Sequence, residues 1–202
     1  WTGFFMTDSA NASLCEAYGN DYAGFYLTNS ASVIESKAEN NRNSPYQPGY
    51  GFLLDEDATA ISIHSNGNSN GVFVSQNAAL LNGDRVCYNN DYNIYSEGGY
   101  IDGNFYTSEI SGWYNGNPTI NPCIVSCGDV IAQDIVLTED LLNCHEDGLV
   151  ISANDMTLDC NGHSIVSVDP DVDEDGVFID NVNSVTVKNC EVQNFYYGIR
   201  SK

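Results

Sequence analysis

A short repeated phrase constrains the fold of this chain more than any other feature. Each copy begins with a glycine, continues with three residues of which the first and third are apolar, and then has a polar turn and another short apolar strand. Copies begin at Gly3, Gly24, Gly51, Gly71, Gly148, Gly176 and Gly198, and Asn93 takes the glycine position in one more. Within each half of the chain they lie 20 to 28 residues apart, too short for one copy to bury a core, so the copies must stack and share one.

Alternation along each first strand predicts which side chains enter the shared core. The first and third residues after the glycine point inward, as in Phe4 and Met6, and coils stack in parallel about 4.8 Å apart. Three asparagines, Asn20, Asn89 and Asn194, each stand four residues before the next copy. This offset predicts a ladder of inward asparagines bonded from coil to coil, although asparagine also simply favours turns.

The second half of the chain carries the most specific pattern. It is made of the segments Cys127–Ile131, Leu137–Cys144, Gly148–Ile165, Val185–Cys190 and Asn194–Ile199. With these segments the chain resembles the right-handed parallel β-helix repeat family, which includes pectin-lyase-like proteins, periplasmic copper-maturation proteins and many microbial surface proteins. The resemblance covers residues 127–202 most closely and extends over 3–96. It implies an all-β fold, a right-handed parallel β-helix in two segments, but no single function.

Three regions are expected along the chain. Residues 1–112 read as roughly five terminal coils of one β-helix, with an insertion at 43–49 that loops outward. Pro118 and Pro122 predict a linker over 113–126. Residues 127–202 would form the cap and first coils of a second β-helix, since in the resembling family a Cys-Gly-Asp opening and a short leucine segment cover the open end of a core. Beginning at Trp1 without methionine, the chain is expected to be a processed or excised piece.

Composition indicates an extracellular or cell-surface protein. Twenty-eight acidic residues against six basic ones give a formal net charge of −22, which argues against binding to nucleic acid or to anionic membranes. Cations, neutral glycans and proteins remain as partners. Seven cysteines favour an oxidising compartment, and no apolar run is long enough for direct membrane insertion.

Four cysteines are expected to pair. Cys127 and Cys144 bracket the cap, and Cys160 and Cys190 occupy nearly the same place in successive coils, within disulfide range. The alternative for the second pair is a ladder of reduced, buried thiols. Three further cysteines, Cys15, Cys87 and Cys123, leave at least one thiol unpaired within the chain. Without a Cys-x-x-Cys motif and with scattered histidines, the sequence argues against a zinc or redox site.

One acidic segment resembles the first half of a calcium-binding loop. Asp171, Asp173 and Asp175 alternate before Gly176, as carboxylates that converge on a hard cation do. The position that should complete the loop is Val182, so an acidic surface turn is the alternative. The expected cofactor is therefore calcium or none.

The sequence favours a non-enzymatic role without excluding catalysis. A polysaccharide lyase needs a basic residue beside calcium-binding carboxylates, and Lys188 has no basic neighbour in the adjacent coils. His163 stands where the resembling family has a turn residue. Paired carboxylates for glycoside hydrolysis remain open, because their separation depends on the fold.

We expect an extracellular structural subunit of a filament or cell-surface appendage, made of copies joined head to tail. Both terminal coils are expected to leave their cores uncovered, so that Ile199 of one copy packs over Phe4 or Phe25 of the next. The alternatives are a carbohydrate-binding or polysaccharide-cleaving β-helix protein, or a fragment of a large tandem β-helix adhesin.

Outward apolar residues, one per copy, are expected to align into a stripe that is covered by loops, by another subunit or by glycan. They are Phe5, Tyr26, Leu53, Phe73, Tyr95, Val150 and Phe178. One sequon, Asn11-Ala12-Ser13, predicts glycosylation of Asn11.

Overall fold

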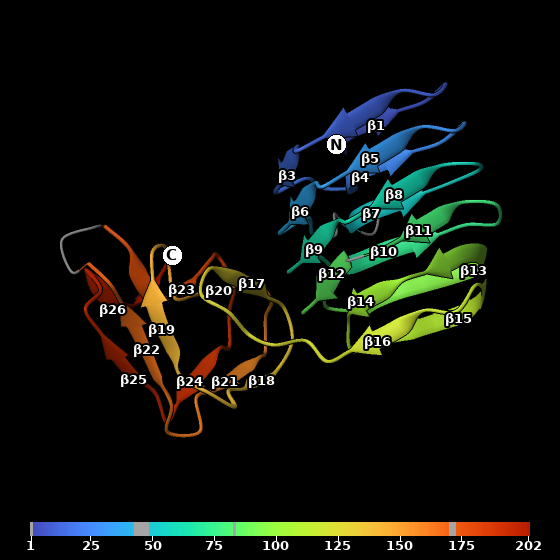
Figure 1. The fold of residues 1–202 in the computed structure, drawn as a ribbon. Helices are drawn as coiled ribbons and strands as arrows, with labels where there is room; N and C mark the ends of the chain where they lie inside the picture. Colours follow the sequence, from blue (N-terminus) through green and yellow to red (C-terminus); the bar gives the residue numbers. More distant parts are fainter. Residues whose placement is uncertain (1, 43–48, 83, 170–172) are drawn as a thin grey trace. The chain divides into compact units, whose positions relative to one another are not determined.

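The computed structural model describes residues 2–42, 49–82, 84–169 and 173–202, and every regular element in these ranges is a β-strand (Figure 1). The chain divides into two compact units, Trp1–Cys123 and Ile124–Lys202. Within each unit, strands pair in parallel with strands one copy away in the sequence. The fold is therefore an all-β parallel β-helix in two units. The described part of the chain contains no helix of the length and hydropathy needed to span a membrane.

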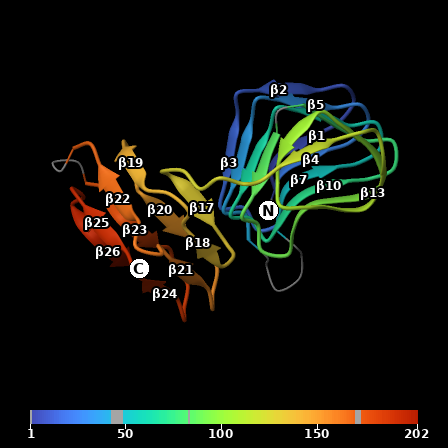
Figure 2. The same ribbon diagram turned by 60° about the horizontal axis from the view of Figure 1, so that its bottom comes forward.

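Three faces enclose the core of the N-terminal unit (Figure 2). The first face consists of β1 (Thr2–Met6), β4 (Ala23–Leu27), β7 (Tyr50–Leu54), β10 (Asn70–Val74), the beginning of β13 (Tyr92–Asp102) and β15 (Ile110–Asn115). The second consists of β2 (Asn11–Ser13), β5 (Ser32–Ile34), β8 (Thr59–Ile61), β11 (Ala79–Leu81) and the end of β13. The third consists of β3 (Glu16–Tyr18), β6 (Lys37–Glu39), β9 (His64–Asn66), β12 (Asp84–Cys87), β14 (Asn104–Tyr106) and β16 (Thr119–Asn121). Because β13 runs along two faces, it joins them into one sheet.

Stacked aromatic rings form one column of this core. The ring centroids of Phe4 and Phe25 are 4.7 Å apart, and those of Phe25 and Phe52 are 4.8 Å apart. Phe25 and Phe52 are fully buried. This spacing equals the distance between neighbouring strands, so identical side chains in successive coils pack face to face.

A ladder of hydrogen-bonded asparagines runs beside the glycines that begin successive copies. The backbone N–H and Nδ2 of Asn20 donate to Oδ1 of Asn41, and both donors of Asn41 bond Oδ1 of Asn68 in the same way. The series continues from Asn68 to Asn89 and ends at Asn93. The ladder predicted from Asn20 and Asn89 therefore exists, but Asn41 and Asn68 also belong to it. A fixed offset of four residues does not identify these two asparagines, because an insertion follows Asn41 and Asn68 stands only three residues before Gly71.

The prediction that Asn194 belongs to such a ladder is wrong. Asn194 is exposed and has a φ of 60°, which places it in the corner position that Gly19, with a φ of 67°, occupies in the first coil. Phe195 follows it, as Asn20 follows Gly19. An apolar side chain thus takes the ladder position at this corner of the C-terminal unit.

The linker predicted over residues 113–126 is also wrong for most of its length. β15 extends to Asn115 and pairs with β13, and β16 pairs with β14, so residues 113–121 belong to the last coil of the N-terminal unit. Pro118 and Pro122 lie outside these strands, where a missing N–H costs no ladder hydrogen bond. The boundary between the units falls after Cys123. The insertion predicted at 43–49 lies outside the described residues except for Gly49.

The C-terminal unit also has three faces. They contain β17 (Asp129–Ile131), β20 (Leu149–Ile151), β23 (Asp175–Ile179) and β26 (Tyr197–Ser201) on the first, β18 (Ile135–Val136), β21 (Thr157–Asp159) and β24 (Thr186–Lys188) on the second, and β19 (Leu141–Cys144), β22 (Ser164–Ser167) and β25 (Glu191–Gln193) on the third. Leu137 and Leu141 of the expected cap are buried, whereas Leu142 is exposed. The leucine segment therefore supplies core side chains to the first coil of this unit.

Candidate functional site

Five of the outward apolar residues align on the first face of the N-terminal unit. Phe5, Tyr26, Leu53, Phe73 and Tyr95 pair in register from β1 to β13, and we call them the outer stripe. Exposure falls along it, from 62% at Phe5 to 9% at Leu53. The stripe is thus open at the N-terminal coil and largely covered in the middle coils.

Tyrosines at the start of the first-face strands supply part of this cover. Tyr22 contacts Tyr26 and Tyr50 edge to face, with centroids 6.1 Å apart in each case, and Tyr92 lies 5.5 Å from Tyr95. Burial is the main cause that raises the pKa of Tyr22, Tyr26 and Tyr92 above the usual phenol value. For Tyr26 the carboxylates of Asp55 and Glu56 raise the pKa further, which places an acidic region next to the stripe.

The remaining two members of the predicted stripe belong to the C-terminal unit, so in-register pairing aligns five of the seven residues. Val150 pairs with Phe178, and Phe178 pairs with Arg200 on the last strand. The guanidinium of Arg200 lies 5.0 Å from the Phe178 ring centre, and the Lys202 ammonium lies 5.3 Å from it. Cationic side chains, rather than another aromatic ring, therefore cover Phe178.

The acidic segment predicted to bind calcium is described only in part. Asp171 lies outside the described residues, and Asp173 is exposed. Asp175 is buried, and its Oδ2 accepts a hydrogen bond of 2.6 Å from Nε of Arg200, while Oδ1 has no hydrogen-bond partner among the described residues. Among the described residues, no group of three or more His, Cys, Asp or Glu side chains is arranged to hold a metal ion.

Calcium binding stays a prediction, which thermal unfolding tests. If the segment binds calcium, millimolar calcium should raise the unfolding temperature relative to the same protein in chelator, because a ligand that binds only the native state stabilises it by RT ln(1 + [L]/Kd). Glu174 gives a reason to expect a response, since burial and the carboxylates of Asp147 and Glu146 raise its pKa. An unchanged midpoint would identify the segment as a solvated turn.

Three disulfides are present among the described residues. Two are the expected pairs, Cys127–Cys144 and Cys160–Cys190, with Cα–Cα distances of 5.3 and 4.8 Å. The third, Cys87–Cys123, was not expected. It joins the end of β12 to the residue after Pro122. The sequence did not indicate this bond, because Cys123 was expected to lie in the linker. Cys15 is left as a half-buried free thiol, and the three bonds indicate an oxidising compartment.

Removing the cap disulfide is expected to destabilise the C-terminal unit. The sequence separation of 17 between Cys127 and Cys144 gives roughly 3 kcal/mol in the chain-entropy model. The double variant Cys127→Ser, Cys144→Ser should therefore unfold at lower denaturant concentration than the natural chain. Peptide mapping without reduction should show the bond directly, and a free Cys144 thiol would contradict the predicted pairing.

Lys188 and His163, which the sequence analysis weighed for catalysis, each contact a carboxylate at the surface. Nζ of Lys188 is 3.2 Å from a carboxylate oxygen of Asp159, and Nδ1 of His163 is 3.1 Å from one of Asp140. A hydrogen bond from Asn189 is the largest cause that lowers the pKa of Asp159, and the N–H of Ser164 has that role for Asp140. Both carboxyls are thus held ionised, which suits a structural role.

Asn11, the predicted glycosylation site, is exposed on β2. Its Nδ2 donates to the carbonyl of Ser9, and its Oδ1 accepts a hydrogen bond from the Ser32 hydroxyl. A glycan on Nδ2 would remove one hydrogen of this amide. Glycosylation stays a prediction.

Comparisons with protein-family models, with curated proteins and with solved structures found no match. The resemblance to the parallel β-helix repeat family therefore stays a hypothesis about relationship.

Proposed function

We propose that the protein is a structural subunit of an extracellular filament or surface appendage, in which copies stack head to tail through their terminal coils. The observation that carries this proposal is that the first coil of the N-terminal unit and the last coil of the C-terminal unit both leave core-facing side chains partly exposed. Three disulfides support an oxidising, extracellular location.

The first coil has a partner on one side only. β1, β2 and β3 lie at the edges of their sheets, so each pairs with a single strand. Phe4 packs on Phe25, but its other ring face has no aromatic partner among the described residues, and Phe4, Ala12 and Cys15 are half-buried although they face the core. Such an edge offers unpaired backbone and apolar side chains to another chain.

The last coil of the C-terminal unit presents the opposite end of a stack. β24, β25 and β26 are edge strands. Ile199 pairs with the buried Val177 but is itself 51% exposed, and Val187 and Val192 are half-buried. β26 of one copy and β1 of the next would pair, with Ile199 against Phe4. Since Phe195 stands in the asparagine position here, strand pairing and apolar contact, rather than the ladder, would hold the junction.

Charge favours contact between unlike ends. Lys188, Arg200 and Lys202 lie on or beside the last strands of the C-terminal unit and are three of the chain's six basic residues. Residues 2–22 contain acidic side chains, at Asp8 and Glu16 among others, and no Lys or Arg. Lys188 and Arg200 have partners within their own copy, at Asp159 and Asp175. The complementarity therefore guides the orientation of docking more than its strength.

Electron microscopy of purified protein tests this function. The natural chain should form long fibres of uniform repeat, because contact between two different surfaces propagates unless it closes into a ring. Deletion of residues 1–22 should abolish these fibres. Phe4→Glu and Ile199→Glu each place a charge on one side of the junction and should also prevent assembly. Phe5→Glu is the matched control, since Phe5 points outward from the same strand and should leave the fibres intact.

The outcomes separate the candidate functions. Fibres of unchanged repeat from the truncated chain would contradict head-to-tail stacking. Discrete monomeric particles from the natural chain at high concentration would favour the tandem-adhesin alternative, in which neighbouring coils belong to one polypeptide.

A further inference from the structure

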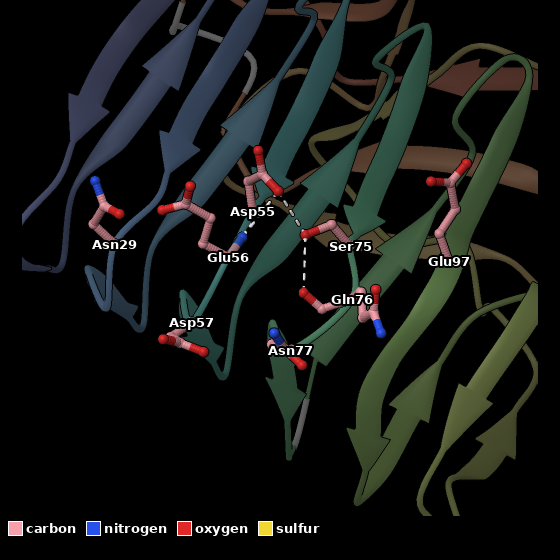
Figure 3. Close-up of a pocket in the computed structure, with 8 residues that line it drawn as sticks. All are labelled: Asn29, Asp55, Glu56, Asp57, Ser75, Gln76, Asn77 and Glu97. Carbon is pink, nitrogen blue, oxygen red and sulfur yellow. Dashed lines mark hydrogen bonds between the residues drawn. The ribbon is translucent and has the colours of Figure 1, made fainter.

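A polar groove follows the turn between the first and second faces of the N-terminal unit (Figure 3). Its lining includes Asp55, Glu56, Asp57, Gln76, Asn77 and Glu97. They come from three successive coils, after β7, after β10 and within β13. An adjoining hollow shares Gln76 and Glu97 with this groove and continues to Trp113 and Tyr114 on β15. Together the two hollows cross several coils, at about 4.8 Å per coil.

The groove presents hydrogen-bond acceptors that the fold leaves partly unused. Asp55 Oδ1 accepts hydrogen bonds from the Ser75 hydroxyl at 2.7 Å and from the Glu56 N–H at 2.9 Å. Asp57 and Glu97 accept no hydrogen bond from the side chains that line the described groove, and no Lys, Arg or His lines it. A ligand that donates several hydrogen bonds would therefore find acceptors in successive coils.

The other end of the groove is aromatic. Trp113 is 77% exposed and Tyr114 is 37% exposed, so both can offer ring surface to a ligand. The amides of Gln76 and Asn115 line the same hollow. A large exposed ring beside amides and carboxylates suits a ligand that has both an apolar face and polar edges.

We propose that this groove binds a linear, uncharged oligosaccharide. A pyranose ring offers a C–H face to Trp113 and hydroxyl donors to carboxylates such as Glu97. Sugars that carry carboxylate or sulfate are rejected, because they would meet Asp55, Glu56, Asp57 and Glu97 without a counter-charge. A chain rather than a single sugar fits acceptors that repeat from coil to coil. This site lies on the side of the unit, and its function does not depend on head-to-tail stacking.

Tryptophan fluorescence and calorimetry of the full chain test this inference. The background variant is Trp1→Phe, so that Trp113 is the only tryptophan. The probes are cellohexaose, mannohexaose and N-acetylchitohexaose, with hexagalacturonate as the acidic counterpart. At least one neutral probe should bind and change the Trp113 emission, and hexagalacturonate should not. Trp113→Ala, followed by calorimetry, should weaken binding about tenfold or more, which corresponds to a loss of roughly 1.4 kcal/mol.

Tyr106→Ala is the matched control, because Tyr106 is an aromatic residue 45% exposed on the third face, outside the groove. It should leave binding unchanged. The inference is overturned if no neutral probe binds at millimolar concentration. It is also overturned if the Trp113→Ala variant binds the neutral probe as tightly as the protein that retains Trp113. Octalysine is the probe for the alternative ligand, a basic protein. The inference is also overturned if octalysine alone binds and Glu97→Gln or added salt weakens that binding.

Discussion

Replacing Asn68 by alanine is expected to lower the free energy of unfolding of the N-terminal unit by about 3–5 kcal/mol. Asn68 is fully buried, and its Oδ1 accepts hydrogen bonds from the backbone N–H and the Nδ2 of Asn41. Its own Nδ2 donates to the Ala38 carbonyl and to Oδ1 of Asn89. Alanine would leave several of these buried groups unpaired, and each unpaired group costs about 1–3 kcal/mol.

Asn90→Ala is the matched control for this change. Asn90 directly follows the ladder residue Asn89, but it is exposed, and within the described ranges its side chain bonds only the neighbouring Asp91. Its replacement should change stability by no more than about 0.5 kcal/mol. Urea unfolding followed by circular dichroism compares the two variants. If Asn68→Ala unfolds at the same midpoint as Asn90→Ala, the ladder does not stabilise the stack.

Adding one methyl group at Gly51 is expected to destabilise the same unit by about 1–3 kcal/mol or more. A Cβ at this position would lie 2.1 Å from Oγ of Ser65, 2.8 Å from Nδ2 of Asn68 and 2.8 Å from the carbonyl oxygen of Gly71. The carbonyl belongs to the next coil, so relief of the clash would have to separate two paired strands. The variant is Gly51→Ala, measured by thermal and urea unfolding.

Gly198→Ala provides the comparison at an equivalent repeat position. A Cβ there would lie 4.0 Å from Val192, in ordinary contact, because β23 is the one described strand that pairs with β26. The substitution should be neutral or slightly stabilising, since alanine reduces the conformational entropy of the unfolded chain. Equal effects at Gly51 and Gly198 would show that close approach between coils does not explain the repeated glycine.

The parallel β-helix could be predicted because its evidence is local and recurs. Phe25 and Phe52 follow glycines in the same way, and alternation sends both inward. The pairs Cys127–Cys144 and Cys160–Cys190 could be predicted from their places in the coils. Asn41 and Asn68 were missed because insertions and deletions between copies change the spacing that identifies a ladder position.

The boundary between the units was misplaced for a related reason. Prolines weaken a strand only where their missing N–H would have paired, and Pro118 and Pro122 lie outside the strands. Because residues 113–121 form the last coil, the Cα atom of Cys123 lies 6.0 Å from that of Cys87. The groove had no sequence signal, since its acidic side chains belong to turns that look like ordinary solvated corners.

The sequence by itself determined the stacked, parallel architecture and the set of inward side chains, because one short phrase repeats and each strand alternates. Only the tertiary structure decided which residues of different copies meet. Glu97 and Trp113 come to line one hollow because their strands stack, and Val150 belongs to a different unit from Tyr95 because the chain divides after Cys123. Which residues of two coils meet depends on the lengths of all the turns between them, and a local sequence pattern does not contain that information.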